Sequence, residues 1–216
     1  YMARVIAQAG NQTIGIKVNR PSWADMYRNY PNESITSKQF YPMISDEYAK
    51  LANKPNSNYN NTCAARMSYA LNRSGIKLPK NGSGTWLGKD GFYYWIRVRE
   101  LKQFLRNRFK NPDFEYTPQR ISVPFTNEQL RNRTIGIRQN ILNKIQGKHG
   151  IIVFDVDGWS DASGHFTLWD GSNLVYVGPG DHNNPNSTEY YFWLIRNPDE
   201  RKRITQTIKI SFWGLK

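Results

Sequence analysis

Cysteine and histidine are both scarce in this chain. Its 216 residues include one cysteine, Cys63, and 3 histidines. A single cysteine cannot form an internal disulfide, so folding does not depend on oxidation. The thiol therefore either packs in the core or takes part in a reaction. The histidines are scattered and lack the close spacing of zinc ligands. We therefore predict neither a metal site nor a cofactor.

Long apolar runs are also missing, and acidic residues are in the minority. No run approaches the roughly 18 apolar residues that a membrane-spanning helix needs, so we expect no membrane insertion. The opening YMARVIAQAG lacks the apolar core of a signal peptide, which indicates that a signal is either absent or already removed. Lys and Arg number 30 against 17 Asp and Glu, a net charge of +13. Such a surplus favours polyanionic partners: nucleic acid, anionic membranes or the bacterial cell wall.

The residues that are present suffice for one folded domain. Hydrophobic residues make up 38% and aromatic residues 14% of the chain, which is enough to bury a core. Residues 1–45 are polar and interrupted by prolines, and we predict an N-terminal extension of unknown role, with a hairpin around Gly10. Residues 46–216 are predicted to form the main domain.

Helical patterns dominate the first part of the predicted domain. A short helix is expected after Ser45, whose hydroxyl can cap it. From Cys63 to about Gly75, the small or apolar residues Cys63, Met67 and Leu71 recur on one helical face. Two amphipathic helices are predicted over 94–109 and 127–145, and their outer faces are rich in Arg and Lys.

The pattern changes to that of strands in the last part of the chain. The run GIIVFDVDG is β-branched and bounded by glycines, and GHFTLWDG alternates in polarity. Three further runs, NLVYV, YYFWLI and TIKISFW, have a similar composition. Helices followed by an antiparallel sheet predict an α+β architecture.

The position of Cys63 suits a nucleophile. A free thiol is mostly protonated at neutral pH, but the unpaired amides of a helix N-terminus stabilise its anion. Asn61 or Thr62 as the N-cap would place Cys63 in the first helical turn. The alternative is that Cys63 is a small core residue, since lone cysteines are often buried.

One histidine has a setting that suits a general base. His149 follows a helix and His182 lies in a polar loop, and both settings are typical of the surface. His165 instead opens the strand HFTLW, which would hold an imidazole rigidly. A structural role for His165 is the alternative.

These residues carry a resemblance to a known family. NTCAARMSYALNRSGIKLP, GHFTLWDG and YYFWLI together resemble the fourth family of type VI secretion amidase effectors, within the NlpC-type papain-like cysteine peptidases. The resemblance spans about residues 61–193. It implies a papain-like α+β fold in which the nucleophile begins a helix packed on an antiparallel sheet that carries the histidine. It implies that Cys63 is the nucleophile and His165 the base.

The resemblance also implies a substrate, a site of action and a partner. Such an enzyme cleaves the γ-D-glutamyl–meso-diaminopimelate amide of peptidoglycan stems through a thioester, as an antibacterial toxin delivered to the periplasm of a target cell. A cognate immunity protein would block its cleft. The backbone amide of Cys63 would hold the oxyanion, with Tyr59 or Asn60 as a second donor or a substrate contact.

The third catalytic residue is harder to place. The resemblance implies an acid shortly after His165, but Asp170 is five residues along the same strand, roughly 17 Å away. Asp170 and Gly171 also form a strong turn signal. We therefore predict Asp181, which follows the next strand. The alternatives are Asp155, Asp157 and Tyr176.

Two other classes of protein compete with an amidase. The basic helices favour a nucleic-acid-binding protein or nuclease toxin if their charges contact phosphate, although such charges more often form a solvated face and no nucleic-acid motif is present. A catalytically inactive cell-wall-binding relative is the second alternative. The presence of both Cys63 and His165 disfavours it, and we expect no nucleic-acid partner.

Overall fold

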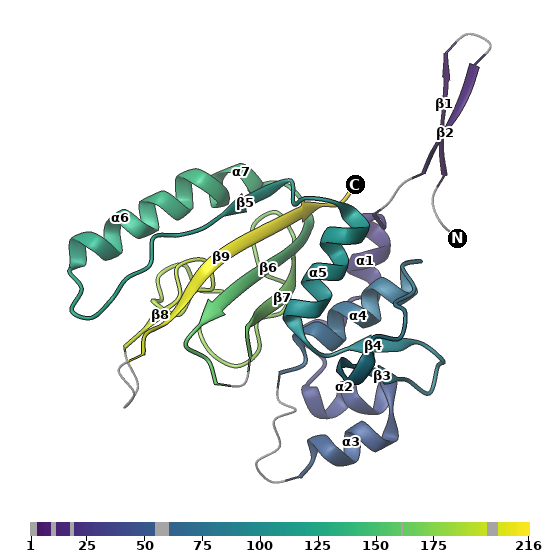
Figure 1. The fold of residues 1–216 in the computed structure, drawn as a ribbon, viewed down its shortest axis with the longest axis horizontal. Helices are drawn as coiled ribbons and strands as arrows, with labels where there is room; N and C mark the ends of the chain where they lie inside the picture. The colour runs from purple at the N-terminus through teal and green to yellow at the C-terminus, as the bar shows by residue number, and fades with distance from the viewer. Residues whose placement is uncertain (1–3, 10–11, 18–19, 55–60, 161, 198–202) are drawn as a thin grey trace.

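The first half of the chain is mainly helical and the second half mainly sheet (Figure 1). The computed structural model describes residues 4–9, 12–17, 20–54, 61–160, 162–197 and 203–216. The predicted α+β class with an antiparallel sheet is confirmed. None of the described helices combines the length and apolar character that crossing a bilayer requires.

A five-stranded sheet forms the centre of the fold. Its order is β5 (Phe114–Tyr116), β9 (Thr205–Gly214), β6 (Gly150–Asp157), β7 (Gly164–Trp169), and β8 (Ile195–Arg196) pairs with β9. The pairings of these strands are antiparallel. Because β7 ends this order, its outer backbone groups are left to bind other parts of the chain. The strand that carries His165 is thus an edge strand, against which other elements can dock.

Both faces of the sheet are covered, as the alternation of side chains along a strand requires. Phe166 and Leu168 of β7 join the cluster that contains Cys63 and Leu101. Trp169 lies in the second cluster, together with the last helical segment before β6 and residues 190–194. The two largest core clusters therefore lie on the two faces of the sheet, and Cys63 belongs to the first of them.

Helix α4 (Cys63–Arg73) confirms the predicted helix and its face. Cys63, Met67 and Leu71 are all at most 1% exposed. Gly75 follows with a φ of 91°, a left-handed conformation that glycine adopts easily and that ends the helix. The helix that carries the thiol is therefore buried along the stripe that its sequence predicts.

The helix expected over 94–109 begins later than predicted. Residues Tyr93–Trp95 form β4, which pairs with β3 (Thr85–Leu87) after a short 3₁₀ turn (Gly82–Gly84), and α5 covers Val98–Phe109. The prediction was wrong at Tyr94 and Trp95, because their apolar side chains fit the helical stripe while aromatic residues also favour strands. Leu101 and Leu105 are fully buried, as the stripe predicts.

The helix expected over 127–145 is present as three consecutive helical segments. They are α6 (Asn127–Ile137), a π-helical turn (Arg138–Leu142) and α7 (Asn143–Ile145). Thr126 and Gln129 form a capping box at its start. Ile137, Ile141 and Ile145 are fully buried, which confirms the predicted inner face.

The described residues before 55 form a hairpin and three helices, of which the third already lies in the predicted main domain. Strands β1 (Arg4–Ala9) and β2 (Gln12–Lys17) form the predicted hairpin (Figure 1). They precede α1 (Trp23–Asn29), α2 (Ser37–Ile44) and α3 (Asp46–Ala52). The hydroxyl of Ser45 caps α3, as predicted. Met26, Phe40 and Ile44 are fully buried, so this part of the segment packs firmly on the domain.

Two runs that were expected to be strands are mostly irregular. The run NLVYV makes a single bridge, between Leu174 and Trp169, and YYFWLI contributes to a strand only at Ile195. The aromatic residues Tyr190 and Phe192 are nevertheless buried against the sheet. The prediction was wrong because an apolar run needs burial, and a loop packed on a sheet provides it as well as a strand does.

Candidate active site

Cys63 is the first residue of α4, as predicted. Thr62 is the N-cap residue, but its hydroxyl does not cap the helix. It accepts instead from the Arg66 Nε at 2.7 Å and hydrogen-bonds the Tyr176 hydroxyl at 2.9 Å. The Cys63 backbone N–H donates to Asn61 Oδ1 at 3.3 Å. Asn61 therefore provides the side-chain contact at this helix start.

Burial decides the protonation state of the Cys63 thiol. The residue is 1% exposed, and this desolvation raises its pKa to about 11. Backbone amides, first of all that of Phe166, and the charge of Arg66 act in the opposite direction but are outweighed. The expectation of a thiolate activated by the helix N-terminus is therefore wrong for this conformation, in which the thiol is neutral at physiological pH.

The sulfur of Cys63 lies against the strand that carries His165. Cys63 packs in the same buried cluster as Phe166, the residue after His165, and the backbone amide of Phe166 acts to lower the pKa of the thiol. The Phe166 carbonyl accepts from the Tyr30 hydroxyl at 3.5 Å. Both contacts use the outer edge of β7, which explains how the N-terminus of α4 docks beside His165.

The imidazole of His165 is held in one tautomer. Its Nε2 lies 2.8 Å from the backbone oxygen of Tyr176. A carbonyl can only accept, so Nε2 carries the proton and Nδ1 is left as the basic nitrogen. The ring also stacks on Tyr191, with 4.4 Å between centroids. These contacts fix the ring as a general base requires.

The pKa of His165 is also shifted by burial. The residue is 4% exposed, and desolvation lowers its pKa to about 4, although the hydrogen bond to Tyr176 acts in the opposite direction. His182 and Arg66 lower it further through their charges. The imidazole is therefore neutral, and free to accept a proton, at any pH well above 4.

The carboxylate predicted as the third residue does not contact His165. Asp181 is exposed, and its backbone oxygen accepts from the Asn184 amide in a turn. Of the alternatives, Asp155 binds Lys102 at 2.7 Å and Asp157 binds Arg120 at 2.5 Å. The Tyr176 phenol binds Thr62, while the Tyr176 backbone carbonyl orients the imidazole. The acceptor at His165 is therefore part of the backbone.

The backbone at Tyr176 is held in place by β7 itself. The Tyr176 N–H donates to Thr167 Oγ1 at 2.9 Å, and the Val175 N–H donates to the Leu168 carbonyl at 3.0 Å. Residues 174–176 therefore run along the outer edge of β7, which brings the carbonyl to His165.

Two adjoining cavities lie at the start of α4. One, of about 330 Å³, is lined by His165, Tyr176 and Tyr191. The other, of about 640 Å³, is lined by Tyr41, Trp86 and Ala65, among others. Asn61 and Ala162 line both, so the cavities meet there. Each is large enough for part of a peptide ligand. The two predicted oxyanion or substrate contacts, Tyr59 and Asn60, lie outside the described residues.

Sequence analysis missed Arg66, one turn after Cys63. It is fully buried and donates to the backbone oxygens of Pro31 and Asn32 at 3.0 Å and of Ile35 at 2.7 Å. Its guanidinium also lies 4.1 Å from the centre of the Tyr176 ring. The signal that could have revealed it is a charged residue within an apolar helical stretch, CAARM.

Arg66 begins a series of hydrogen bonds that reaches the imidazole. Its Nε donates to Thr62, the Thr62 hydroxyl bonds the Tyr176 phenol, and the Tyr176 carbonyl bonds His165. The start of the nucleophile helix is thereby connected to the base. A change at Arg66 should therefore displace groups at both Cys63 and His165.

His182 was expected at the surface but is 5% exposed. Its Nδ1 lies 2.7 Å from the Glu189 carbonyl, and its ring stacks on Tyr191 with 4.4 Å between centroids. It lines the same cavity as His165. The polar loop around it gave no sign of this burial, which arises where the ring packs against Tyr191 and the Glu189 carbonyl.

Comparison with protein families gives a match over most of the chain. Residues 59–213 match the family described as type VI secretion system (T6SS), amidase effector protein 4. The comparison with curated proteins found no match.

Three solved structures illustrate the similarity in fold. The effector Tae4 from Enterobacter cloacae is 24% identical, with a TM-score of 0.61, and the match covers 91% of this chain and 98% of that one. The Tae4–Tai4 effector–immunity complex from the same organism matches at 24% identity and a TM-score of 0.60, over 91% and 99%. Tae4 from Salmonella typhimurium in complex with the immunity Tai4 from Enterobacter cloacae matches at 23% identity and a TM-score of 0.62, over 91% and 100%.

Proposed function

This chain belongs to the family of type VI secretion system amidase effector protein 4, and on that premise we propose that Cys63 and His165 are its catalytic dyad. As a member, it is an antibacterial amidase that degrades peptidoglycan in the periplasm of the target cell. One observation carries the proposal: Cys63 and Phe166, the residue after His165, pack in the same buried cluster, and the bond from His165 Nε2 to the Tyr176 carbonyl leaves Nδ1 as the basic nitrogen of the imidazole.

The proposed reaction starts from a neutral thiol and a neutral imidazole. As sulfur attacks the carbonyl carbon of the scissile amide, the thiol proton passes to His165 Nδ1. The imidazolium then protonates the leaving nitrogen, the carbon–nitrogen bond breaks and a thioester remains. Water attacks the thioester while His165 accepts its proton, and the thiol is restored.

Two backbone groups complete the proposed site. The Cys63 N–H, which donates to Asn61 in the structure, would turn to the oxyanion of the tetrahedral intermediate. The Tyr176 carbonyl, in place of the predicted Asp181, would hold the imidazole and stabilise its charged form. This arrangement, with a thiol at a helix start beside an edge strand bearing the base, supports the papain-like NlpC-type topology that the family resemblance implies.

We propose the γ-D-glutamyl–meso-diaminopimelate amide as the bond that is cut. Digestion of purified sacculi with the protein, followed by mass analysis, should release fragments that end in D-glutamate together with fragments that begin with diaminopimelate. Intact stems after prolonged digestion, or cleavage at another bond, would refute this assignment.

The pH dependence of kcat/KM should follow the lowered pKa of His165. Below about pH 4 the imidazole is protonated and cannot accept the thiol proton, so the rate should fall there and stay level up to neutral pH. The measurement is kcat/KM on a soluble muropeptide across this range, with unfolding followed in parallel. A midpoint near 6.5, the value of an unperturbed imidazole, would contradict a buried base.

A cognate immunity protein is the partner that we propose. Two of the similar solved structures are complexes of an effector with an immunity protein. A partner that covers the cavity beside His165 would exclude substrate without altering the fold. The family assignment favours an amidase over the nucleic-acid-binding and inactive-relative alternatives.

We propose that residues 46–216 form the amidase domain and residues 1–45 an extension. Part of that extension supports the site, because the carbonyls of Pro31, Asn32 and Ile35 bind the guanidinium of Arg66. Tyr41 also lines the larger of the two cavities at the start of α4.

A further inference from the structure

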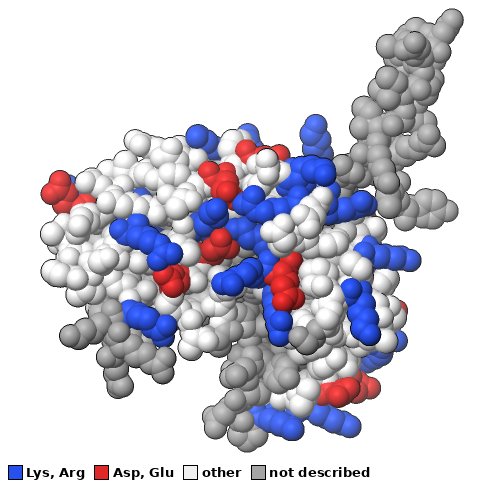
Figure 2. Space-filling view, in the orientation of Figure 1, with Lys and Arg blue, Asp and Glu red and all other residues white. Residues whose placement is uncertain are grey.

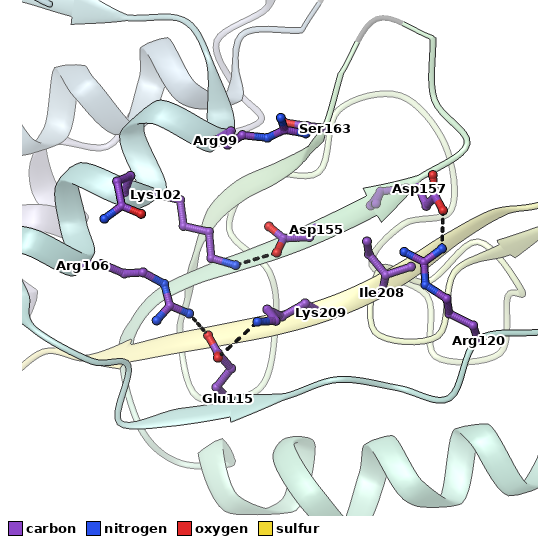
Figure 3. Close-up of a pocket in the computed structure, with 12 residues that line it drawn as sticks. Arg99, Lys102, Arg106, Glu115, Arg120, Asp155, Asp157, Ser163, Ile208 and Lys209 are labelled. Atoms are coloured by element: carbon purple, nitrogen blue, oxygen red, sulfur yellow. Dashed lines mark hydrogen bonds and ion pairs between the residues drawn. The ribbon is translucent and has the colours of Figure 1, made fainter.

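A charged groove lies beside α5, on the part of the sheet that this helix leaves open (Figure 3). Its volume is about 560 Å³. We call it the basic groove, because its charged lining residues are Arg99, Lys102, Arg106, Arg120 and Lys209 with Glu115, Asp155 and Asp157. Five cations thus face three carboxylates. Figure 2 shows Lys and Arg gathered over the middle of this face, with acidic residues among them.

The groove follows from the amphipathic pattern of α5. Leu101 and Leu105 point into the core, which leaves Arg99, Lys102 and Arg106 on the flank that borders the sheet. Asp155 of β6 lies opposite Lys209 of β9 in the register. Helix and sheet therefore supply opposite walls of the groove, as the close-up shows (Figure 3).

The carboxylates of the groove do not match all of its cations. Lys102 pairs with Asp155 at 2.7 Å, and Arg120 pairs with Asp157 at 2.5 Å. Arg106 and Lys209 share one carboxylate, that of Glu115 (Figure 3). Arg99 makes no ion pair with any residue that the structure describes. The groove therefore keeps an excess of positive charge and an unused guanidinium for an anion.

The basic groove is continuous with the proposed active site. Arg99 and Ser163 line both the groove and the 640 Å³ cavity at the start of α4. That cavity meets the His165 cavity at Asn61 and Ala162. Three cavities thus follow one another from the imidazole to the groove, and Arg99 stands where the groove begins.

We propose that the basic groove binds the free carboxylates of a second stem peptide, cross-linked to the stem that is cut; this inference rests on the proposed function. Glutamyl and diaminopimelyl residues keep carboxylates outside their amide bonds, and a cross-linked stem extends these charges beyond the scissile amide. The planar guanidinium of Arg99 suits a carboxylate, which it can bind through two parallel hydrogen bonds. The groove is therefore a specificity element for cross-linked substrate.

Binding to two purified muropeptides tests the proposal: a disaccharide tetrapeptide and its cross-linked dimer. Calorimetry in the Cys63→Ala background prevents turnover. Arg99→Gln should raise the Kd for the dimer by about three- to tenfold and leave that for the monomer nearly unchanged. Arg131→Gln, which removes the same charge from the exposed surface of α6, is the matched control and should change neither value.

Kinetics and chemical modification add two independent readouts. With Cys63 intact, Arg99→Gln should raise KM for the dimer without lowering kcat. Conversion of the dimer's carboxylates to amides should weaken its binding to the unmodified protein more than its binding to the Arg99→Gln variant. The reason is that the variant has already lost the contact between Arg99 and a carboxylate that the amidation removes.

Three results would overturn the inference. The first is that Arg99→Gln weakens binding of the monomer and the dimer equally. The second is that Arg99→Gln raises the Kd for the dimer no more than Arg131→Gln does. The third is that the protein binds inorganic phosphate through Arg99 and binds both muropeptides equally well. The last would assign the groove to phosphate-bearing polymers. Failure of the unmodified protein to cut either muropeptide would instead refute the proposed function.

Discussion

Cys63→Ala should reduce the release of stem fragments from sacculi by about 10⁴-fold or more, to the background of the assay. Without the sulfur no thioester can form, and the groups that remain cannot replace a covalent intermediate. His165→Gln should cause a loss of similar size, because the thiol is neutral and must transfer its proton during the attack. The measurement is the initial rate of fragment release, quantified by mass.

Both variants need controls that separate chemistry from folding. His149→Gln is the matched control for His165→Gln, since His149 is exposed and lies outside the two cavities at the start of α4. Its rate should equal that of the unmodified protein. Near-native circular dichroism and denaturant midpoints for Cys63→Ala would show that the fold survives. Undiminished cutting by Cys63→Ala would remove Cys63 from the mechanism.

Arg66→Met should lower the free energy of unfolding by roughly 3 kcal/mol or more. The guanidinium donates to the buried carbonyl of Pro31 and to the partly buried carbonyls of Asn32 and Ile35, and methionine would leave these acceptors without that donor. Urea unfolding measures the effect, as a lower midpoint with an unchanged slope. The rate of hydrolysis should also fall, because Thr62 and Tyr176 lose the group that positions them.

Arg73→Met is the control on the same helix. Arg73 pairs with Asp90 at 2.7 Å, but both side chains are partly exposed, and such pairs contribute about 0–1 kcal/mol. A stability loss at Arg66 no larger than that at Arg73 would contradict the structural role of the buried guanidinium. If the Arg66→Met protein is destabilised but folded and its rate of hydrolysis is unchanged, the hydrogen bonds that connect Thr62 to His165 do not depend on the Arg66 guanidinium.

The sequence by itself determined the elements that carry the chemistry. A helix starting at Cys63 followed from the spacing of Met67 and Leu71, and the strand of His165 followed from the alternation in HFTLW. The helical and the strand repeat of apolar residues are both local features of the sequence, because each element buries one of its faces. They can therefore be recognised without knowing what the element packs against. The start of α5 was misplaced because Tyr94 and Trp95 fit the apolar repeat of a helix, although aromatic residues also favour strands.

The neighbours of the catalytic groups were decided only by tertiary structure. The acceptor at His165 is the backbone carbonyl of Tyr176, and every residue has such a carbonyl, so no side-chain pattern could single it out. The search for a carboxylate therefore led to Asp181, which is exposed. The protonation states of the thiol and the imidazole also depend on burial, and that burial arises only when α4, residues 174–176 and Tyr191 pack against β7.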